Sequence, residues 1–196
     1  MLIPPPRFEP VEIDLTGLSF WGRLKAICQT PPRFRYSEDW IVTLDNGLRL
    51  IIPKGFVTDF ASVPRIFWAI PGFSPNGPLL WGAGWHDFAF QHGYLLSPFD
   101  PEREYELESH ALYATFNITF GDNMPVFVGA TQEVFDDLLA EITIKKTGAE
   151  FVAAVAKEAL GRFGDKVWNR YRELGPGAYN DNSLGLPGIT ENGVRF

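Results

Sequence analysis

The sequence predicts an α+β fold, with a mainly helical body of three to five helices and a small antiparallel β-hairpin in its N-terminal half. Three observations support this fold class. Two β-type runs flank a turn signal at residues 45–47, a nearly continuous apolar segment spans residues 78–92, and apolar residues recur every four positions in residues 149–174. Both ends of the chain lack such a period, and we expect them to form extended terminal arms.

The hairpin is predicted from residues 40–44 and 48–52, which are rich in β-branched and apolar side chains. Asp45-Asn46-Gly47 lies between them, and Asn and Gly tolerate the positive φ of a tight turn. Pro53 has no backbone N–H to donate to a neighbouring strand, so the second strand is expected to end there.

Two helices are expected next. A short one begins at Ser62 or Val63 and runs to about Ile70, because Pro64 suits the first helical turn. A longer one runs from about Pro78 to His92 and ends at Gly93. Its apolar side chains go almost all the way round the helix, which is typical of a helix in the centre of a fold.

Three further helices are predicted over residues 102–117, 131–143 and 149–174. The last is amphipathic, and Gly161 and Gly164 can bend or split it. We expect its buried face to follow the four-residue period Phe151, Val155, Ala159, Phe163, Val167 and Tyr171.

The chain therefore divides into an N-terminal arm and lead-in (1–32), a single globular domain (33–174) and a C-terminal arm (175–196). The arms are rich in Pro, Gly and Asn and cannot bury enough apolar surface to offset their ordering entropy alone. We expect the arms to pack against the domain or against a neighbouring chain.

Composition excludes several classes of protein. A net charge of -7 over 196 residues argues against general nucleic-acid binding. Cys28 is the only cysteine, so an intramolecular disulfide is impossible and the chain fits a reducing compartment. No signal peptide is expected. No apolar stretch reaches the roughly 20 residues needed to span a bilayer, because Pro and Gly interrupt each candidate.

The pair His86-Asp87 is the most informative feature, because it lies between Trp85 and Phe88 inside the apolar helix. An ionised carboxylate is costly there unless it is paired, hydrogen-bonded or metal-bound. A dry environment also favours a neutral imidazole, which can act as a base. The two residues are about 100° apart on the helix, so they can flank one cleft. The pair is either an internal brace between helices or a reactive site.

Other polar residues can complete such a site. Asp59, Ser62 and Arg65 belong to one turn; they either cap local backbone donors, or Asp59 approaches His86 or a metal while Arg65 neutralises Asp87.

On the third helix, one carboxylate of Asp136 and Asp137 is expected to be solvated, and the other to reach into the core toward His86. His92 is expected in the last helical turn, where the helix dipole favours a cation, and its spacing from His86 disfavours zinc.

Residues 55–65 (Gly-Phe-Val-Thr-Asp-Phe-Ala-Ser-Val-Pro-Arg) and 86–90 (His-Asp-Phe-Ala-Phe) resemble the phage and prophage family known as domain of unknown function thirteen fifty-three. That family shows Gly-Phe-x-Thr-Asp-x-Ala-Ser-x-Pro and then His-Asp-x-x-Tyr, followed by a helix with Ala-Asp-x-x-Phe. The resemblance covers about residues 40–165 and includes Asp136 in the third element. Phe90 replaces the usual Tyr, and residues 97–130 resemble an insertion.

The His-Asp helix is also similar to that of secreted prokaryotic phospholipase A2. The similarity implies His86 as the base, Asp87 as a calcium ligand and Asp136 as the residue that orients His86. Those enzymes are stapled by disulfides, and this chain departs from them in having one cysteine.

The family resemblance leads us to expect a bacteriophage virion-associated accessory protein of the tail or neck, found in the virion and in the host cytoplasm during assembly. Its partners would be other phage structural proteins, and copies of the chain could associate within a larger assembly. In this interpretation no cofactor is needed, and Asp59, Ser62, Arg65 and Phe90 are structural or line the site. The alternatives are a small calcium-assisted hydrolase and a host modulator that acts by binding alone, so the residues leave open whether the protein is an enzyme.

Overall fold

The apolar helix predicted from Pro78 to His92 forms the centre of the fold. It is α2 (Leu80–His92), and Gly93 ends it in the left-handed conformation with φ 81°. The computed structural model describes residues 1–29, 33–60, 77–98, 123–178 and 182–195, and gives only the backbone for residues 27–29. Ten of the residues of α2 are buried, as expected for a helix that is apolar on all sides.

The described elements confirm the α+β class. The helices are α1 (Phe20–Gln29), α2, α4 (Gln132–Thr147), α5 (Glu150–Phe163) and α6 (Asp165–Leu174). The strands are β1 (Phe8–Val11), β2 (Arg33–Tyr36), β3 (Trp40–Thr43), β4 (Arg49–Ile52), β5 (Val57–Thr58), β6 (Leu95–Pro98), β7 (Asn123–Val126), β8 (Gly188–Thr190) and β9 (Gly193–Arg195).

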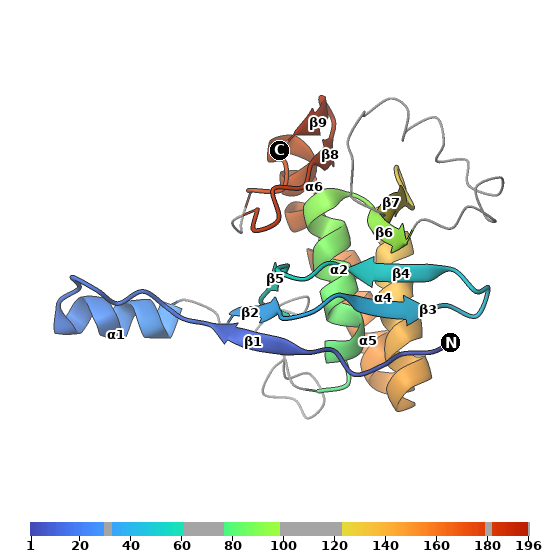
Figure 1. Cartoon of the computed structure of the whole chain (residues 1–196), viewed down its shortest axis with the longest axis horizontal. Coiled ribbons are helices and arrows are strands. Elements are labelled where there is room, and N and C mark those ends of the chain that lie inside the picture. Colours follow the sequence, from blue (N-terminus) through green and yellow to red (C-terminus); the bar gives the residue numbers. More distant parts are fainter. Residues whose placement is uncertain (30–32, 61–76, 99–122, 179–181, 196) are drawn as a thin grey trace.

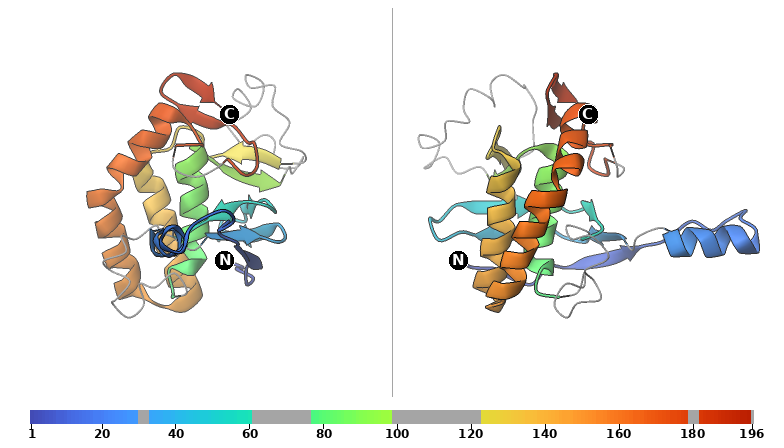
Figure 2. Two further views of the ribbon diagram at one scale, coloured as in Figure 1. Left: turned by 90° about the vertical axis from the view of Figure 1, so that its left-hand side faces the viewer. Right: turned by 180° about the vertical axis from the view of Figure 1, so that it is seen from behind.

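Helix α2 lies between two layers. The sheets β1-β2-β5 and β3-β4-β6-β7 are antiparallel and lie on one side of it, and α4, α5 and α6 lie on the other side (Figures 1 and 2). The small hairpin β8-β9 contacts α6 near the C-terminal end of α2. Within the described parts of the chain, no helix is both long and apolar enough to cross a membrane.

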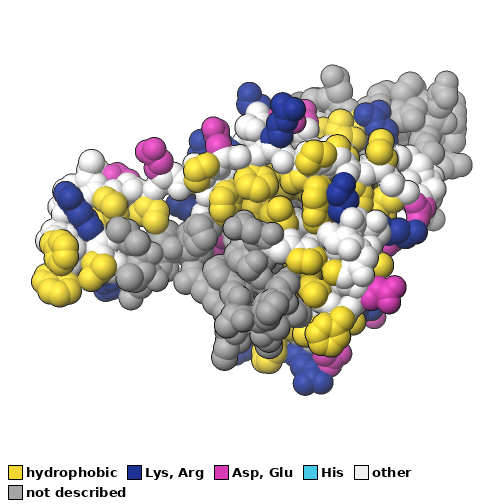
Figure 3. Space-filling model, turned by 90° about the horizontal axis from the view of Figure 1, so that it is seen from below, with side chains coloured by type: hydrophobic (Ala, Val, Ile, Leu, Met, Phe, Trp, Pro, Cys, Tyr) yellow, Lys and Arg dark blue, Asp and Glu magenta, His cyan; other side chains and the backbone are white. Residues whose placement is uncertain are grey.

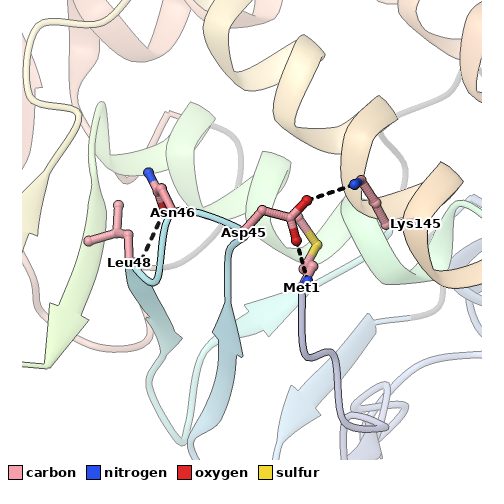
Figure 4. Close-up of polar contacts among 5 residues, drawn as sticks. All are labelled: Met1, Asp45, Asn46, Leu48 and Lys145. Carbon is pink, nitrogen blue, oxygen red and sulfur yellow. Dashed lines mark hydrogen bonds and ion pairs between the residues drawn. The ribbon is translucent and has the colours of Figure 1, made fainter.

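The predicted hairpin is confirmed as β3 and β4. Trp40 pairs with Ile52 and Thr43 with Arg49, and Gly47 in the turn has φ 79°. The turn is tied to the helical layer through Asp45, whose carboxylate accepts hydrogen bonds from the Met1 ammonium and, at 2.6 Å, from Lys145 Nζ of α4 (Figure 4). These two cations lower the pKa of the Asp45 carboxyl to about 2, Lys145 having the larger effect.

The helices after α2 are confirmed with one correction. The predicted helix over 131–143 is α4, and the segment 149–174 splits at Gly164 into α5 and α6. The predicted apolar face is wrong at Phe151, which is 74 % exposed, and at Phe163, which is 59 % exposed, whereas Ala159 and Tyr171 are buried as predicted. The buried residues of α5 are Ala153, Ala156, Ala159 and Leu160. Small side chains let α5 approach α4 closely, which a row of phenylalanines would prevent.

The short helix predicted from Ser62 or Val63 to Ile70 and the helix predicted over 102–117 lie outside the described residues, as does most of the expected insertion 97–130. The N-terminal arm contains β1 and α1. The C-terminal arm contains β8 and β9.

Candidate functional site

Two glycines fit α2 between its neighbours. A Cβ at Gly82 would lie 2.5 Å from the carbonyl oxygen and 2.9 Å from the Cα of Leu139, so α2 and α4 touch backbone to backbone there. A Cβ at Gly84 would collide with the hydroxyl of Tyr36, on the strand side of the helix. The helix can therefore present His86 to α4 at short range.

His86 pairs with Asp136. The Nε2 atom of His86 lies 2.7 Å from Oδ1 of Asp136, and the two side chains are 2 % and 4 % exposed. The other carboxylate oxygen of Asp136 accepts a hydrogen bond of 3.1 Å from Nε2 of Gln132, which also donates to the Leu160 carbonyl of α5 at 3.1 Å. This buried network joins α2, α4 and α5.

The Asp136 contact sets the orientation of the imidazole. An ionised carboxylate only accepts hydrogen bonds, so Nε2 of His86 carries the donated proton and Nδ1 is the acceptor of the neutral ring. Nδ1 is buried without a hydrogen-bond partner among the described residues. Phe90 covers the ring, with 4.0 Å between the two ring centres. The imidazole therefore has one nitrogen fixed by Asp136 and one buried nitrogen without a partner among the described residues.

Asp87 lies on the other side of α2. The hydroxyl of Thr58 donates to Oδ2 of Asp87, and the backbone N–H of Phe60 donates to the Thr58 oxygen at 3.0 Å. Thr58 and Asp87 come from the two motifs that carry the family resemblance, so this contact joins those motifs in space. His86 and Asp87 therefore face opposite layers instead of flanking one cleft.

Tyr36 lies near Asp87. Its hydroxyl is buried without a hydrogen-bond partner among the described residues. Burial, and secondarily the negative charge of Asp87, raises the pKa of Tyr36 well above its ordinary value. The phenol is therefore kept neutral at any physiological pH.

Asp136 also lines an open groove of about 780 Å³ between α4, α5 and α6. The groove is lined by Thr131, Gln132, Glu133, Asp136, Ala154, Lys157, Glu158, Gly161, Arg162, Asp165 and Trp168. Asp136 thus lies at the floor of a surface groove, and His86 lies behind Asp136, farther from the groove.

The remaining predicted site residues are scattered. Asp59 is half-buried directly after β5, and Ser62 and Arg65 lie outside the described residues. Asp137 is exposed and forms an ion pair with Lys157, which matches the expected division between a solvated and a buried carboxylate. In the described segments, no group of three or more His, Cys, Asp or Glu side chains is arranged to hold a metal ion. The role of Asp87 as a calcium ligand stays a prediction.

The expectation that His92 is a cation is wrong. His92 is fully buried, and burial, together with the nearby Arg172, lowers its pKa to about 4 despite a hydrogen bond to the Pro187 carbonyl that acts in the opposite direction. Nδ1 of His92 lies 3.1 Å from that carbonyl oxygen, and the Tyr94 hydroxyl donates to the same oxygen at 2.8 Å. The C-terminal segment covers the helix end, and the helix dipole is weaker than the resulting desolvation.

Sequence reasoning missed several of these partners. Gln132 is four residues before Asp136, a spacing that places both on one face of α4, so this partner could have been found. Pro187 lies in a segment without a pattern, and nothing local indicates that its carbonyl meets His92 and Tyr94.

No curated protein and no solved structure matches the chain. One family model does match, over residues 34–114, and its description is "Protein of unknown function (DUF1353)". The matched segment contains Thr58, His86 and Asp87, whereas Asp136 lies beyond it, so the place of Asp136 in the family pattern stays a prediction. The part of the chain that joins the two motifs through Thr58 and Asp87 thus lies within the segment that matches the DUF1353 family model.

Proposed function

We propose that this protein is an accessory structural component of a bacteriophage particle, in the tail or neck assembly, and that it binds neighbouring particle proteins through its terminal arms. The observation that carries the proposal is α1, a helix of the N-terminal arm that stands away from the body of the molecule (Figure 1).

Helix α1 exposes large apolar side chains. Phe20 and Trp21 are each 73 % exposed and Leu24 is 44 % exposed. Phe20 and Leu24 are four residues apart and share one face of the helix. Hydrophobic side chains gather at the end of the molecule that α1 forms (Figure 3). Such an exposed group of apolar side chains is typical of a protein-binding surface.

The length of α1 supports the same function. It has ten residues, and isolated helices shorter than about 12–15 residues are marginal in water. The right-hand view of Figure 2 shows α1, in blue, separated from α2 and from the other helices. A helix of this length gains most of its stability from packing, so a partner outside the body would stabilise it.

The phage assignment comes from the family resemblance. The acidic chain is repelled by nucleic acid, which favours protein partners within the particle. We therefore expect other phage structural proteins as partners, and a location in the virion and, during assembly, in the host cytoplasm.

The proposal is tested in purified particles. A phage lacking this gene is complemented with the wild-type chain or with the double variant Phe20→Ser/Trp21→Ser, and the copy number is measured by quantitative mass spectrometry. The wild type should be present at a fixed copy number, and the double variant should be lost from the particles with an unchanged melting temperature. Phe163→Ser is the matched control, because it also removes an exposed phenylalanine and should be incorporated normally. Absence of the wild-type chain from particles would refute the proposal.

A second candidate is a small hydrolase in which His86 is the base and Asp136 orients it, while a calcium ion at Asp87, on the opposite side of α2, is a separate prediction. The observation that favours it is the 2.7 Å contact between His86 Nε2 and Asp136, which leaves Nδ1 without a partner among the described residues. Base catalysis by an imidazole needs this division of roles between the two nitrogens.

The two candidates predict different results for His86→Ala. The variant should lose stability in either case, because the His86 side chain is buried, but only in a hydrolase does it also remove a catalytic activity of the wild-type chain. Calcium binding is tested separately by thermal melting, because an ion that binds the folded state must raise the melting temperature. An unchanged melting temperature at saturating calcium would count against the calcium ligand role of Asp87.

A further inference from the structure

We infer that α1 of one copy docks in the groove between α4, α5 and α6 of a second copy, so that the chain assembles head to tail. The inference deepens the proposed function, on which it rests for the protein-binding role of α1, and it names the partner.

The groove has the surface that an amphipathic helix needs. Ala154 and Gly161 are exposed along its wall, and no atom of the described residues lies within 4 Å of the position that a Cβ of Gly161 would occupy. Trp168 lines it as an apolar surface. Phe151 lies three residues before Ala154, on the same side of α5, and is 74 % exposed. Small and aromatic side chains together form a groove into which the large side chains of another helix can fit.

The lengths agree. Phe151 and Gly161 are ten residues apart on α5, which is about 15 Å at 1.5 Å per residue. Helix α1 also has ten residues. Laid along α5, it can therefore reach from Phe151 to the part of the groove that Gly161 lines.

The charges are complementary. Arg23 and Lys25 are the charged residues of α1, which has no acidic residue. The groove is lined by four acidic residues and two basic ones, and both basic residues are already paired, Lys157 with Asp137 and Arg162 with Glu158.

Two carboxylates of the groove stay available for the cations of α1. Glu133 and Asp165 form no ion pair with a described residue. An arriving α1 would bring Arg23 and Lys25 to a rim that has excess negative charge, which steers association and fixes register.

The two surfaces are different, which determines the symmetry of the contact. Helix α1 extends from the end of the molecule at which β1 ends, whereas the groove belongs to the helical layer behind α2 (Figures 1 and 2). A contact between two different surfaces is heterologous, and repeated heterologous contacts form rings or filaments.

Sedimentation velocity on the purified full chain tests the inference. The wild type should self-associate as its concentration rises. Trp21→Ser in α1 and Phe151→Ser beside the groove should each weaken association by about tenfold or more, because central aromatic side chains dominate interface energies. Phe163→Ser should associate as the wild type does, because Phe163 is exposed nine residues after Ala154, on the opposite side of α5 from the groove-lining face. Circular dichroism would verify that every variant keeps its helices.

A mixing experiment identifies the geometry. Trp21→Ser keeps an intact groove and Phe151→Ser keeps an intact α1, so an equimolar mixture should form a 1:1 dimer that does not grow further. Pairing of α1 with α1 would give no such recovery and would overturn the inference. A chain that is monomeric at all concentrations, or whose association is unaffected by Phe151→Ser, would also overturn it. The proposed function fails separately, by absence of the wild-type chain from particles.

Discussion

His86 and Asp136 depend on each other because both are excluded from water. Their contact satisfies one nitrogen and one carboxylate oxygen, and Gln132 satisfies the second oxygen. A buried pair adds little net stability over an apolar pair of the same size, but removal of one partner leaves the other without compensation. The loss of stability in the double variant should therefore differ from the sum of the losses in the two single variants.

We predict that His86→Ala and Asp136→Ala each lower the free energy of unfolding by about 3 kcal/mol, and that the double variant costs clearly less than the two together. Urea unfolding of the four chains measures the coupling. Asp137→Ala is the control next to the site: its exposed ion pair with Lys157 should cost below about 1 kcal/mol. Additive costs would show that the two side chains do not act as a pair.

His92 gives the molecule a dependence on pH. Its folded-state pKa is lowered to about 4 from an ordinary value of 6.5, so between these values the unfolded chain binds a proton that the folded chain does not. The contribution of neutral His92 to the free energy of unfolding is therefore fully present above about pH 6.5 and is lost as the pH falls toward 4. The full loss is about 3 kcal/mol, from the size of the shift.

We predict a decrease of this order between pH 7 and pH 4 in urea unfolding, and a much smaller decrease in His92→Gln over the same range. The comparison isolates His92 from carboxylates such as Asp45, whose pKa of about 2 places its own loss of stabilisation at lower pH. Equal slopes in both chains would contradict the assignment.

At the scale of elements, the contact between α2 and α4 depends on glycine. The Cβ of Gly82→Ala would meet backbone atoms of Leu139, which cannot move without separating the two helices. We predict a loss of about 2 kcal/mol, as overpacking exceeds the gain in helix propensity.

Gly161→Ala is the matched control, for which we expect a change in stability of the opposite sign. Position 161 in α5 is also helical, but in the part of the chain that the structure describes no atom lies within 4 Å of a Cβ there, so alanine should stabilise the chain by about 0.5–1 kcal/mol. Both variants would be compared by urea unfolding at low protein concentration. A stabilising Gly82→Ala would show that α2 and α4 are less tightly packed than described.

The elements that could be predicted have local signals. Asn46-Gly47 indicates the hairpin, Gly93 ends α2, and the all-round apolar pattern places α2 in the centre. One carboxylate of Asp136 and Asp137 was expected to reach toward His86, and the structure shows that it is Asp136.

The errors have a common physical cause. The burial of α5 was assigned from the period of its large side chains, yet the face that packs on α4 is lined with alanine, because helix approach rewards small residues. His92 was judged from the dipole of its own helix, but Pro187, 95 positions later in the chain, covers it. Long-range packing of this kind leaves no local pattern.

For the whole molecule, the C-terminal arm is part of the core. The Pro187 carbonyl is the acceptor for both His92 and Tyr94, and the Arg195 guanidinium donates to the Glu173 carbonyl of α6. We predict that a chain ending at residue 181 loses about 3 kcal/mol or more, because two buried groups lose their partner. Thermal melting measures this loss. An unchanged melting temperature would mean that the segment lies on the surface as a detachable arm.

The His86–Asp136 contact crosses the boundary of the segment that matches the family, since the imidazole lies inside it and the carboxylate outside. In relatives, these two positions should therefore covary. A relative that has an apolar residue in place of the histidine gains nothing from a buried aspartate 50 positions later, and one that keeps the histidine must supply an acceptor from whatever helix follows. Among sequences that match the family model, substitutions at positions 86 and 136 should accordingly occur together.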